Sequence, residues 1–274
     1  MEELCWINAS VTRLADATVS VDDRGYVFAD GVYEVFRVYA GKTFAVEAHL
    51  RRLARSCEGI ELSLQYSLEE IDKAVHNLVR QSELESGIVY LQATRGVAPR
   101  GHAFPLNTPA TLMIYTRSMS FTHCARQRVI SVPDERWKRC WIKAIALLPN
   151  VLAKNLAVKA NADEAILVDD GLVQEGSTSN VFIVERDTLI TPPIGPKVLP
   201  GVTRELLLPL AQSIGMKVEE RPIPIAEALA ADEAFLTSTT REVAWIGQWD
   251  TRTFGEACGE WTRRLSDAFR PTPG

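Results

Sequence analysis

Apolar and polar positions alternate early in the chain and predict a strand over residues 33–39, which are rich in aromatic and β-branched side chains. Because strand side chains point to alternate faces, Tyr33, Val35 and Arg37 share one face. A turn and a short return strand are predicted through 40–46.

Spacings of three and four residues between apolar positions follow, and they predict helices over 49–60 and 67–82. Two further alternating segments, 87–94 and 110–117, are predicted strands. They flank a loop at 95–108 that is rich in glycine and proline. The first part of the chain therefore mixes helices with paired strands.

A polar and poorly periodic segment, 119–127, is interpreted as a linker between an N-terminal domain (1–118) and a C-terminal domain (128–274). The second domain begins with an apolar, strand-like run around Lys143. Later elements are a helix over 150–161, strands at 164–168, 172–174, 180–184, 188–191 and 233–236, and helices that begin near Thr203 and Ile225. This mixture predicts two α+β domains and not a doubly wound parallel sheet.

Composition excludes several classes of protein. The 274 residues are 46% hydrophobic and 24% charged, with a net charge of −5 and no basic block, so nucleic-acid binding is not expected. The acidic start does not resemble a signal peptide, and no apolar run has membrane-spanning length. Five cysteines and four histidines are dispersed without a CxxC pair, which indicates neither a disulfide framework nor a metal site. We expect a reduced, cytoplasmic protein with no membrane partner.

Lys143 lies in the apolar run 139–148, where a lysine is unusual. Removing an ammonium group from water favours its neutral form, which is a nucleophile that can form a Schiff base with an aldehyde cofactor. The alternative is a lysine on the outer face of a strand whose amine reaches water.

An aldehyde cofactor with a phosphate group would need further partners, and the sequence offers candidates. A glycine turn that opens a helix, at Val202 and Thr203, could bind phosphate through backbone N–H groups. Ser238 and Thr239 lie in a second hydroxyl-rich turn after an apolar strand. Each turn also has a purely structural explanation, as a helix cap or a turn former.

Three charged or polar side chains could recognise a ring nitrogen and a carboxylate. Glu175 could keep a pyridine nitrogen protonated. Arg100 and His102 lie two residues apart in the glycine- and proline-rich loop, where they could bind a substrate carboxylate. Glu175 could instead be a solvated turn residue, Arg100 a solvated loop residue and His102 a structural histidine.

The motifs together resemble the fold-type IV pyridoxal-phosphate enzymes, and among them the D-amino acid transaminases. The resemblance covers nearly the whole chain, in the family's order and spacing. The motifs are DRGY (23–26), DGVYEV (30–35), RGH (100–102), the lysine run, EGSTSN (175–180), GVTR (201–204) and TSTT (237–240).

The resemblance implies a homodimer of two-domain α+β subunits with pyridoxal 5'-phosphate between the domains. It implies that Lys143 carries the Schiff base and moves the α-proton, and that Glu175 pairs with the pyridine nitrogen. Leu199 would pack on the ring. The implied phosphate ligands are Arg52, Val202, Thr203, Ser238 and Thr239.

On the substrate side, the resemblance implies that Tyr33 holds the α-carboxylate together with Arg100 and His102 of the partner subunit. Val35 shares the face of Tyr33 and is included in the expected substrate site. Arg37 and Arg241 could bind a second carboxylate, or could point to solvent or pair with a protein carboxylate.

The activity implied is transamination between a D-amino acid, such as D-alanine or D-glutamate, and a 2-oxo acid, such as 2-oxoglutarate or pyruvate. Other enzymes of the same fold remain alternatives: a branched-chain L-aminotransferase, an aminodeoxychorismate lyase or an R-selective amine transaminase. A cofactor-free binding protein that shares the fold is a third possibility.

Overall fold

The computed structural model describes residues 2–269 and divides the chain into two compact units. The first unit runs to Ser120 and also includes Ile142–Ala146, whereas the second includes Phe121–Trp141 and the chain from Leu147 onward. The change of unit at Ser120 falls in the segment expected as a linker. Residues 1 and 270–274, at the ends of the two expected domains, lie outside the described residues.

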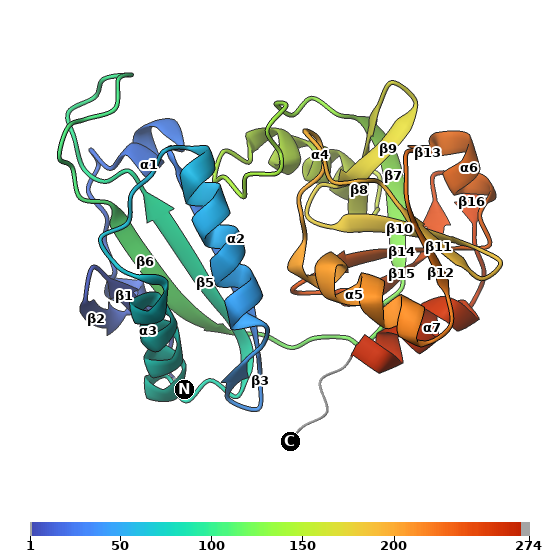
Figure 1. Cartoon of the computed structure of the whole chain (residues 1–274), viewed down its shortest axis with the longest axis horizontal. Coiled ribbons are helices and arrows are strands. Elements are labelled where there is room, and N and C mark those ends of the chain that lie inside the picture. Colours follow the sequence, from blue (N-terminus) through green and yellow to red (C-terminus); the bar gives the residue numbers. More distant parts are fainter. Residues whose placement is uncertain (1, 270–274) are drawn as a thin grey trace. The chain divides into compact units, whose positions relative to one another are not determined.

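The first unit is an antiparallel sheet with two long helices packed on one face (Figure 1). Its elements are β1 (Leu4–Ile7), β2 (Ser10–Arg13), η1 (Leu14–Asp16), α1 (Arg24–Phe28), β3 (Gly31–Tyr39), β4 (Lys42–Thr43), α2 (Val46–Gly59), α3 (Leu68–Gln81), β5 (Ser86–Thr94) and β6 (Thr111–Ser118). Within the described residues the six strands follow the order β2-β1-β6-β5-β3-β4. The apolar stripe of α2 covers β3, so alternate residues of β3 face that helix.

The second unit is built on a larger mixed sheet (Figure 1). Its elements are β7 (Gln127–Pro133), α4 (Leu148–Lys159), β8 (Glu164–Asp169), β9 (Leu172–Gly176), β10 (Asn180–Glu185), β11 (Thr188–Thr191), α5 (Val202–Ser213), β12 (Lys217–Glu220), β13 (Ile223–Pro224), α6 (Ile225–Ala230), β14 (Glu233–Ser238), β15 (Glu242–Trp249), β16 (Arg252–Thr253) and α7 (Glu260–Phe269). In the described part of the chain the order is β12-β11-β10-β14-β15-β7-β8-β9-β13, with β16 beside β15.

One apolar core joins residues from most strands of this larger sheet, which therefore curves around it. Val129, Val173, Ile190, Leu236 and Trp249 are each at most 1% exposed and belong to this cluster. Helix α5 packs against β14, α7 packs against β15, and α4 packs on β8. The curved sheet thereby brings the ends of β9, β10 and β14 into one region.

The expectation of two α+β domains is confirmed, but the expected strand around Lys143 is wrong. Ile142 and Ala144 are buried and Lys143 is half-buried, so the alternation of the sequence is real. The segment, however, forms only an isolated bridge between Ala144 and Val32. It lies along the edge of β3, in the first unit and not in the second domain where the sequence suggested it.

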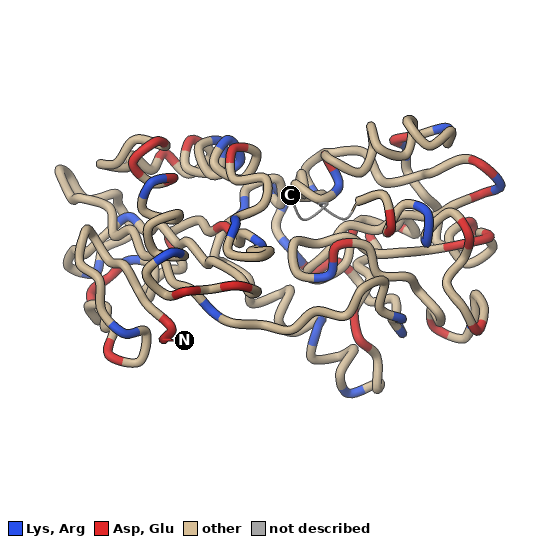
Figure 2. The backbone as a smooth tube through the Cα atoms, turned by 90° about the horizontal axis from the view of Figure 1, so that it is seen from below, with Lys and Arg blue, Asp and Glu red and all other residues tan. Residues whose placement is uncertain are grey.

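Basic and acidic positions are interspersed along both units (Figure 2). This mixture agrees with the modest net charge of −5. No helix among the described residues is long and apolar enough to cross a lipid bilayer.

Candidate active site

Lys143 is held against the start of β3 by backbone hydrogen bonds. The amide of Tyr33 donates to the carbonyl of Lys143 at 2.9 Å, and the amide of Ile145 donates to the carbonyl of Gly31 at 3.0 Å. The amide of Lys143 donates to Ser56 Oγ at 3.1 Å. These bonds fix the backbone of Lys143, so its side chain projects from a rigid support.

The amine of Lys143 lies over an aromatic ring that the sequence also placed in the site. Its Nζ is 4.1 Å from the ring centroid of Tyr33, within the range of a cation–π contact. Val35 lies on the same face of β3 as Tyr33, opposite Tyr90 in the register. The first unit thus brings together Lys143, Tyr33 and Val35.

A buried charge cluster lies on the other face of β3, where it contacts α2. Arg52 donates from Nε to Glu34 Oε1 at 2.7 Å and from Nη2 to Glu34 Oε2 at 2.6 Å. Nδ1 of His49 lies 2.8 Å from Glu34 Oε2. Burial alone would raise the pKa of Glu34, but Arg52 and His49 outweigh it and lower that pKa to about 2. Glu34 is therefore a fixed anion that orients Arg52.

His49 has the opposite balance. Burial lowers its pKa, Glu34 acts to raise it, and the positive charges of Arg52 and Lys143 lower it further. His49 is therefore neutral at physiological pH, and its contact with Glu34 is a hydrogen bond and not an ion pair. Sequence reasoning assigned no role to Glu34 or His49. Strand alternation would have placed Glu34 toward α2, and His49 and Arg52 share a helix face because they are three residues apart.

Arg100 and His102 meet at one aromatic side chain. Arg100 Cζ lies 5.3 Å from the ring centroid of Phe28, and the ring of His102 lies 5.5 Å from it. Both side chains are exposed. The structure thus brings this pair together on the surface of the first unit.

Two buried arginines fix the loop that carries the pair. Arg24 and Arg95 both donate to Asp30, through Nε contacts of 2.8 and 2.9 Å to Oδ2. Nη1 of Arg24 also donates to the carbonyl of Gly101 at 2.6 Å, between Arg100 and His102. A buried cluster of ion pairs therefore fixes the backbone of this loop.

The side chain of Arg37 lies at a distance from that of Tyr33. It lies four residues further along β3, about 13 Å away at a strand's rise per residue. The side chain is buried, with Cζ 4.6 Å from the ring centroid of Tyr39. Arg37 therefore does not point to solvent, which was one of its expected alternatives.

In the second unit, Glu175 is the centre of a buried polar cluster. Arg136 Nη1 donates to Oε1 of Glu175. The side-chain amide of Asn180 and the backbone amide of Leu199 donate to Oε2 at 3.1 and 2.9 Å. Burial, aided by the charge of Asp134, raises the pKa of Glu175 to about 7 in spite of Arg136. This carboxyl group can therefore hold or release a proton near neutral pH.

Asn180 connects Glu175 to the start of α5. Its Nδ2 also donates to the carbonyl of Leu199 at 2.9 Å. A Cβ on Gly201 would lie 2.0 Å from Asn180 Oδ1, so only glycine fits there. Asn180 lies in the EGSTSN motif but had no expected role of its own, and no periodic pattern marks Arg136, which was missed.

Four of the five residues expected to bind phosphate lie around this start of α5, whereas Arg52 lies on α2 of the first unit. Val202 and Thr203 are buried in its first turn, and Gly201 before them provides no side-chain cap for the N–H groups. Ser238 ends β14, whose preceding residue Thr237 pairs with Asn180 in the sheet register. Thr239 is half-buried beside Ser238. A helix start without a side-chain cap, with hydroxyl groups nearby, has the donors that suit an anion.

Arg241 pairs with a protein carboxylate, which was one of its expected alternatives. Its Nη1 donates to Glu164 Oε2 at 2.7 Å and to Thr178 Oγ1 at 3.0 Å. Glu164 is fully buried and also accepts hydrogen bonds from Ser177 and Thr178. Arg241 thereby connects the turn after β14 with the turn between β9 and β10.

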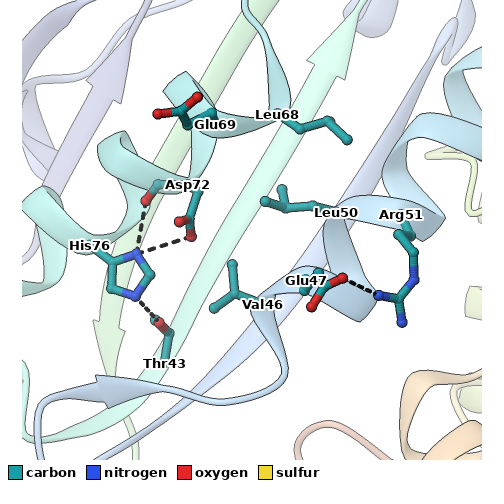
Figure 3. Close-up of a pocket in the computed structure, with 9 residues that line it drawn as sticks. All are labelled: Thr43, Val46, Glu47, Leu50, Arg51, Leu68, Glu69, Asp72 and His76. Atoms are coloured by element: carbon teal, nitrogen blue, oxygen red, sulfur yellow. Dashed lines mark hydrogen bonds and ion pairs between the residues drawn. The ribbon is translucent and has the colours of Figure 1, made fainter.

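A surface cavity of about 600 Å³ lies elsewhere in the first unit, beside α2 and α3 (Figure 3). His76 lies in its wall, 3.1 Å from Thr43 Oγ1 and 3.0 Å from Asp72 Oδ1. Arg51 pairs with Glu47 at 2.8 Å in the same wall. A third lining carboxylate, Glu69, pairs with Lys73 at 2.7 Å, and none of the expected site residues lines the cavity.

Comparison with known proteins identifies the family. The profile of the amino-transferase class IV family matches residues 31–249. The chain is 38% identical to proteins named D-alanine aminotransferase from Staphylococcus epidermidis, over 96% of this chain and 95% of the relative, and from Bacillus licheniformis, over 96% and 94%. The crystal structure of Escherichia coli branched-chain amino acid aminotransferase superposes with a TM-score of 0.91 at 25% identity, over 98% of this chain and 94% of that one. The chain belongs to the amino-transferase class IV family.

Proposed function

We propose that the protein is a pyridoxal-phosphate-dependent D-amino acid aminotransferase. It exchanges the amino group between a D-amino acid, such as D-alanine or D-glutamate, and a 2-oxo acid, such as 2-oxoglutarate or pyruvate. The observation that carries this proposal is the 38% identity to D-alanine aminotransferases over nearly the full length of both chains. The arrangement of Lys143 and Tyr33 supports it.

The donor sets of the structure fit pyridoxal 5'-phosphate. Lys143 would provide an amine for the aldehyde, Glu175 a carboxyl group for the ring nitrogen, and the start of α5, which has no side-chain cap, its N–H groups for the phosphate. When bound, the cofactor supplies an electrophilic carbon and a ring that withdraws electrons from the substrate Cα. We assign Leu199 to the ring, because its amide is held by Glu175.

Proton transfer is assigned to Lys143. Its side chain would take the α-proton from one side of the substrate and return it in the reverse half-reaction. The negative charge of Glu175 would favour the protonated form of the ring nitrogen. Arg136 and Asn180 hold the Glu175 carboxyl group in one orientation.

Phosphate binding is assigned to the amides of Val202 and Thr203 with the hydroxyls of Thr203, Ser238 and Thr239. Arg52 adds a positive charge, and we infer that Glu34 orients its guanidinium. Such charge-assisted contacts are the strongest hydrogen bonds that a phosphate makes with protein.

Substrate recognition is assigned to Tyr33 and Val35 beside the amine, and to the Arg100–His102 pair supplied by the partner subunit. A bidentate arginine on one side fixes the α-carboxylate and so decides which Cα–H bond faces Lys143. The exposure of Arg100 and His102 on a braced loop supports a role outside their own subunit. Arg37, buried at a distance along β3, and Arg241, paired with Glu164, remain secondary candidates for a second substrate carboxylate.

We infer a homodimer, and helix α4 supports it. Five large apolar side chains of this helix are 49–67% exposed: Leu148, Val151, Leu152, Leu156 and Val158. They fall on one side of the helix, and an exposed apolar patch of this kind marks a protein interface. We also place the enzyme in the cytoplasm, which agrees with its five free cysteines.

A branched-chain L-aminotransferase is the alternative, favoured by the structural likeness to the E. coli enzyme. The lower identity of that relative, 25% against 38%, argues for the D-amino acid reaction. We expect the Arg100–His102 pair, whose loop is fixed by Arg24, to distinguish the D-amino acid reaction from the branched-chain L-amino acid reaction.

Replacing the lysine tests the proposal. Lys143→Ala should lose the visible absorbance of bound pyridoxal phosphate and its transamination of D-alanine, because no other amine replaces Lys143 at the ring of Tyr33. Lys159→Ala, an exposed lysine at the end of α4, should keep both. Normal turnover by Lys143→Ala would overturn the assignment.

A further inference from the structure

Two cysteines that are distant in sequence meet in the second unit. Sγ of Cys124 lies 3.3 Å from Sγ of Cys258, and both residues are half-buried. Cys124 lies just before β7, and Cys258 just before α7. A disulfide requires a sulfur separation of about 2.05 Å, so a side-chain movement of about 1.3 Å would join them.

The backbone on both sides of the pair is held in place. Glu233 accepts hydrogen bonds from the amides of Trp261 and Thr262 at 3.0 and 2.8 Å. A Cβ on Gly259 would lie 2.1 Å from Cδ of Glu233, so the chain next to Cys258 passes closely over this carboxylate. On the other side, His123 Nε2 lies 3.0 Å from Asp267 Oδ1 of α7. The two thiols therefore face each other in a fixed geometry.

Electrostatics separates the two thiols into different roles. The hydrogen bond from Cys258 lowers the pKa of Cys124 to about 7; burial opposes this, and Ser266 and His123 add to it while Asp267 opposes it. The same hydrogen bond raises the pKa of Cys258, with burial and Glu233 acting in the same direction and Arg263 against it. These influences favour Cys124 as the thiolate and Cys258 as the proton donor.

The other three cysteines provide a natural contrast. Cys5, Cys57 and Cys140 are buried. Burial raises the pKa of Cys5 and Cys140 to about 11 and that of Cys57 to about 12. Thiols that remain protonated in a core do not react with oxidants.

We propose that the Cys124–Cys258 pair is a site of reversible oxidation, at which a hydroperoxide converts the two thiols into an intramolecular disulfide. The bond would tie the segment before β7 to the start of α7. None of the residues assigned to transamination takes part, so the site can be tested independently of that activity.

The chemistry balances in two steps. The Cys124 thiolate attacks a peroxide oxygen: an S–O bond forms, the O–O bond breaks, and the leaving oxygen takes up a proton, so Cys124 becomes a sulfenic acid. The sulfur of Cys258 then attacks Cys124: an S–S bond forms, the S–O bond breaks, and the hydroxyl leaves as water with the proton of Cys258. With hydrogen peroxide, two thiols yield one disulfide and two waters.

The experiment treats the native holoenzyme with hydrogen peroxide and analyses it by mass spectrometry without reduction. We expect the loss of two hydrogens and a cross-link between the tryptic peptides SMSFTHCAR and TFGEACGEWTR, which contain Cys124 and Cys258. Dithiothreitol should reverse both changes. The rate should rise with pH through about 7, as Cys124 ionises.

Variants distinguish the pair from general thiol oxidation. Cys258→Ser should retain one oxygen on Cys124, detectable with a sulfenic-acid reagent, and form no disulfide. Cys124→Ser should react much more slowly, while Cys5→Ala should behave like the unaltered protein. The proposal is overturned if folded protein forms no Cys124–Cys258 bond, or if Cys124 is oxidised no faster than the three buried cysteines.

Discussion

Glu34 in the first unit and Glu175 in the second are both buried glutamates, at 0% and 5% exposure, that contact an arginine. Their pKa values move in opposite directions, to about 2 for Glu34 and about 7 for Glu175. Similar burial and an arginine partner therefore do not by themselves determine the pKa of a carboxyl group.

The difference lies in what else the arginine contacts. Burial raises the pKa of both glutamates, but Arg52 directs Nε and Nη2 to Glu34, and His49 adds a further hydrogen bond. Arg136 directs Nε and Nη2 to Asp134 and only Nη1 to Glu175, and the charge of Asp134 itself raises the pKa of Glu175. Because Asp134 competes for the guanidinium of Arg136, the pKa of Glu175 is raised and its carboxylate remains available to pair with a ring nitrogen, whereas Glu34 remains a structural anion.

Of the substitutions at the two glutamates, Glu175→Gln should have the larger effect on catalysis. Without a carboxylate to keep the ring nitrogen protonated, we expect kcat for D-alanine to fall on the order of 10³-fold. Folding should be less affected, because Arg136 keeps its bonds to Asp134. Steady-state kinetics of the holoenzyme would show this, and a kcat within a few-fold of the unaltered enzyme would remove Glu175 from the mechanism.

Glu34→Gln should mainly destabilise the fold. It leaves the buried guanidinium of Arg52 without its counter-charge, so we expect the free energy of unfolding to fall by about 3 kcal/mol. Urea denaturation measures it. Glu47→Gln is the matched control on α2, since Glu47 and Arg51 form an exposed pair at 2.8 Å that should contribute less than about 0.5 kcal/mol. Equal losses in both variants would contradict the account.

The pH dependence of apoenzyme stability should separate the two glutamates. Because folding raises the pKa of Glu175, its protonated carboxyl group contributes to the free energy of unfolding in full below pH 4.5. This contribution is lost as the pH rises through about 7. Because folding lowers the pKa of Glu34, its ionised carboxylate contributes to the free energy of unfolding above pH 4.5. That contribution is lost as the pH falls toward about 2. Each amounts to about 3 kcal/mol at most.

Denaturation of the unaltered protein and of the two variants between pH 3 and 8 tests these signs, because this range covers most of the interval between the two shifted pKa values. Glu175→Gln should flatten the profile between pH 4.5 and 7, and Glu34→Gln should flatten it below 4.5. A Glu175→Gln profile parallel to that of the unaltered protein would show that Glu175 has an ordinary pKa.

A smaller effect is expected at the loop of Arg100 and His102. Arg24→Lys keeps the charge but loses the fork that joins Asp30 to the carbonyl of Gly101. We expect KM for D-alanine to rise about 10-fold with a smaller change in kcat, as for one charge-assisted hydrogen bond. Arg117→Lys, at an exposed pair with Glu3, is the control. A change in kcat alone would argue against a positioning role.

Much of the fold and of the site could be predicted because local patterns determine them. Alternation identified β3, and a Ser67–Glu70 capping box marks the start of α3. The family motifs indicated Lys143 and Glu175, which the structure places in suitable surroundings.

The remaining features depend on contacts between distant segments. The run around Lys143 alternates like a strand but binds only the edge of β3, a distinction that local sequence does not contain. Asn180 joins Glu175 to Leu199, and Arg136 reaches Glu175 from 39 residues away. The cysteine spacing likewise gave no sign of the 3.3 Å approach of Cys124 to Cys258.

The central claim is tested most directly by the hand of the amino donor. Purified holoenzyme is incubated with 2-oxoglutarate and with D-alanine, L-alanine or L-leucine as donor, and the glutamate formed is measured and resolved into its two enantiomers. The account predicts rapid turnover of D-alanine with D-glutamate as the product, and little turnover of either L-amino acid. Preferential turnover of L-leucine with L-glutamate as the product would contradict it and establish the branched-chain reaction instead.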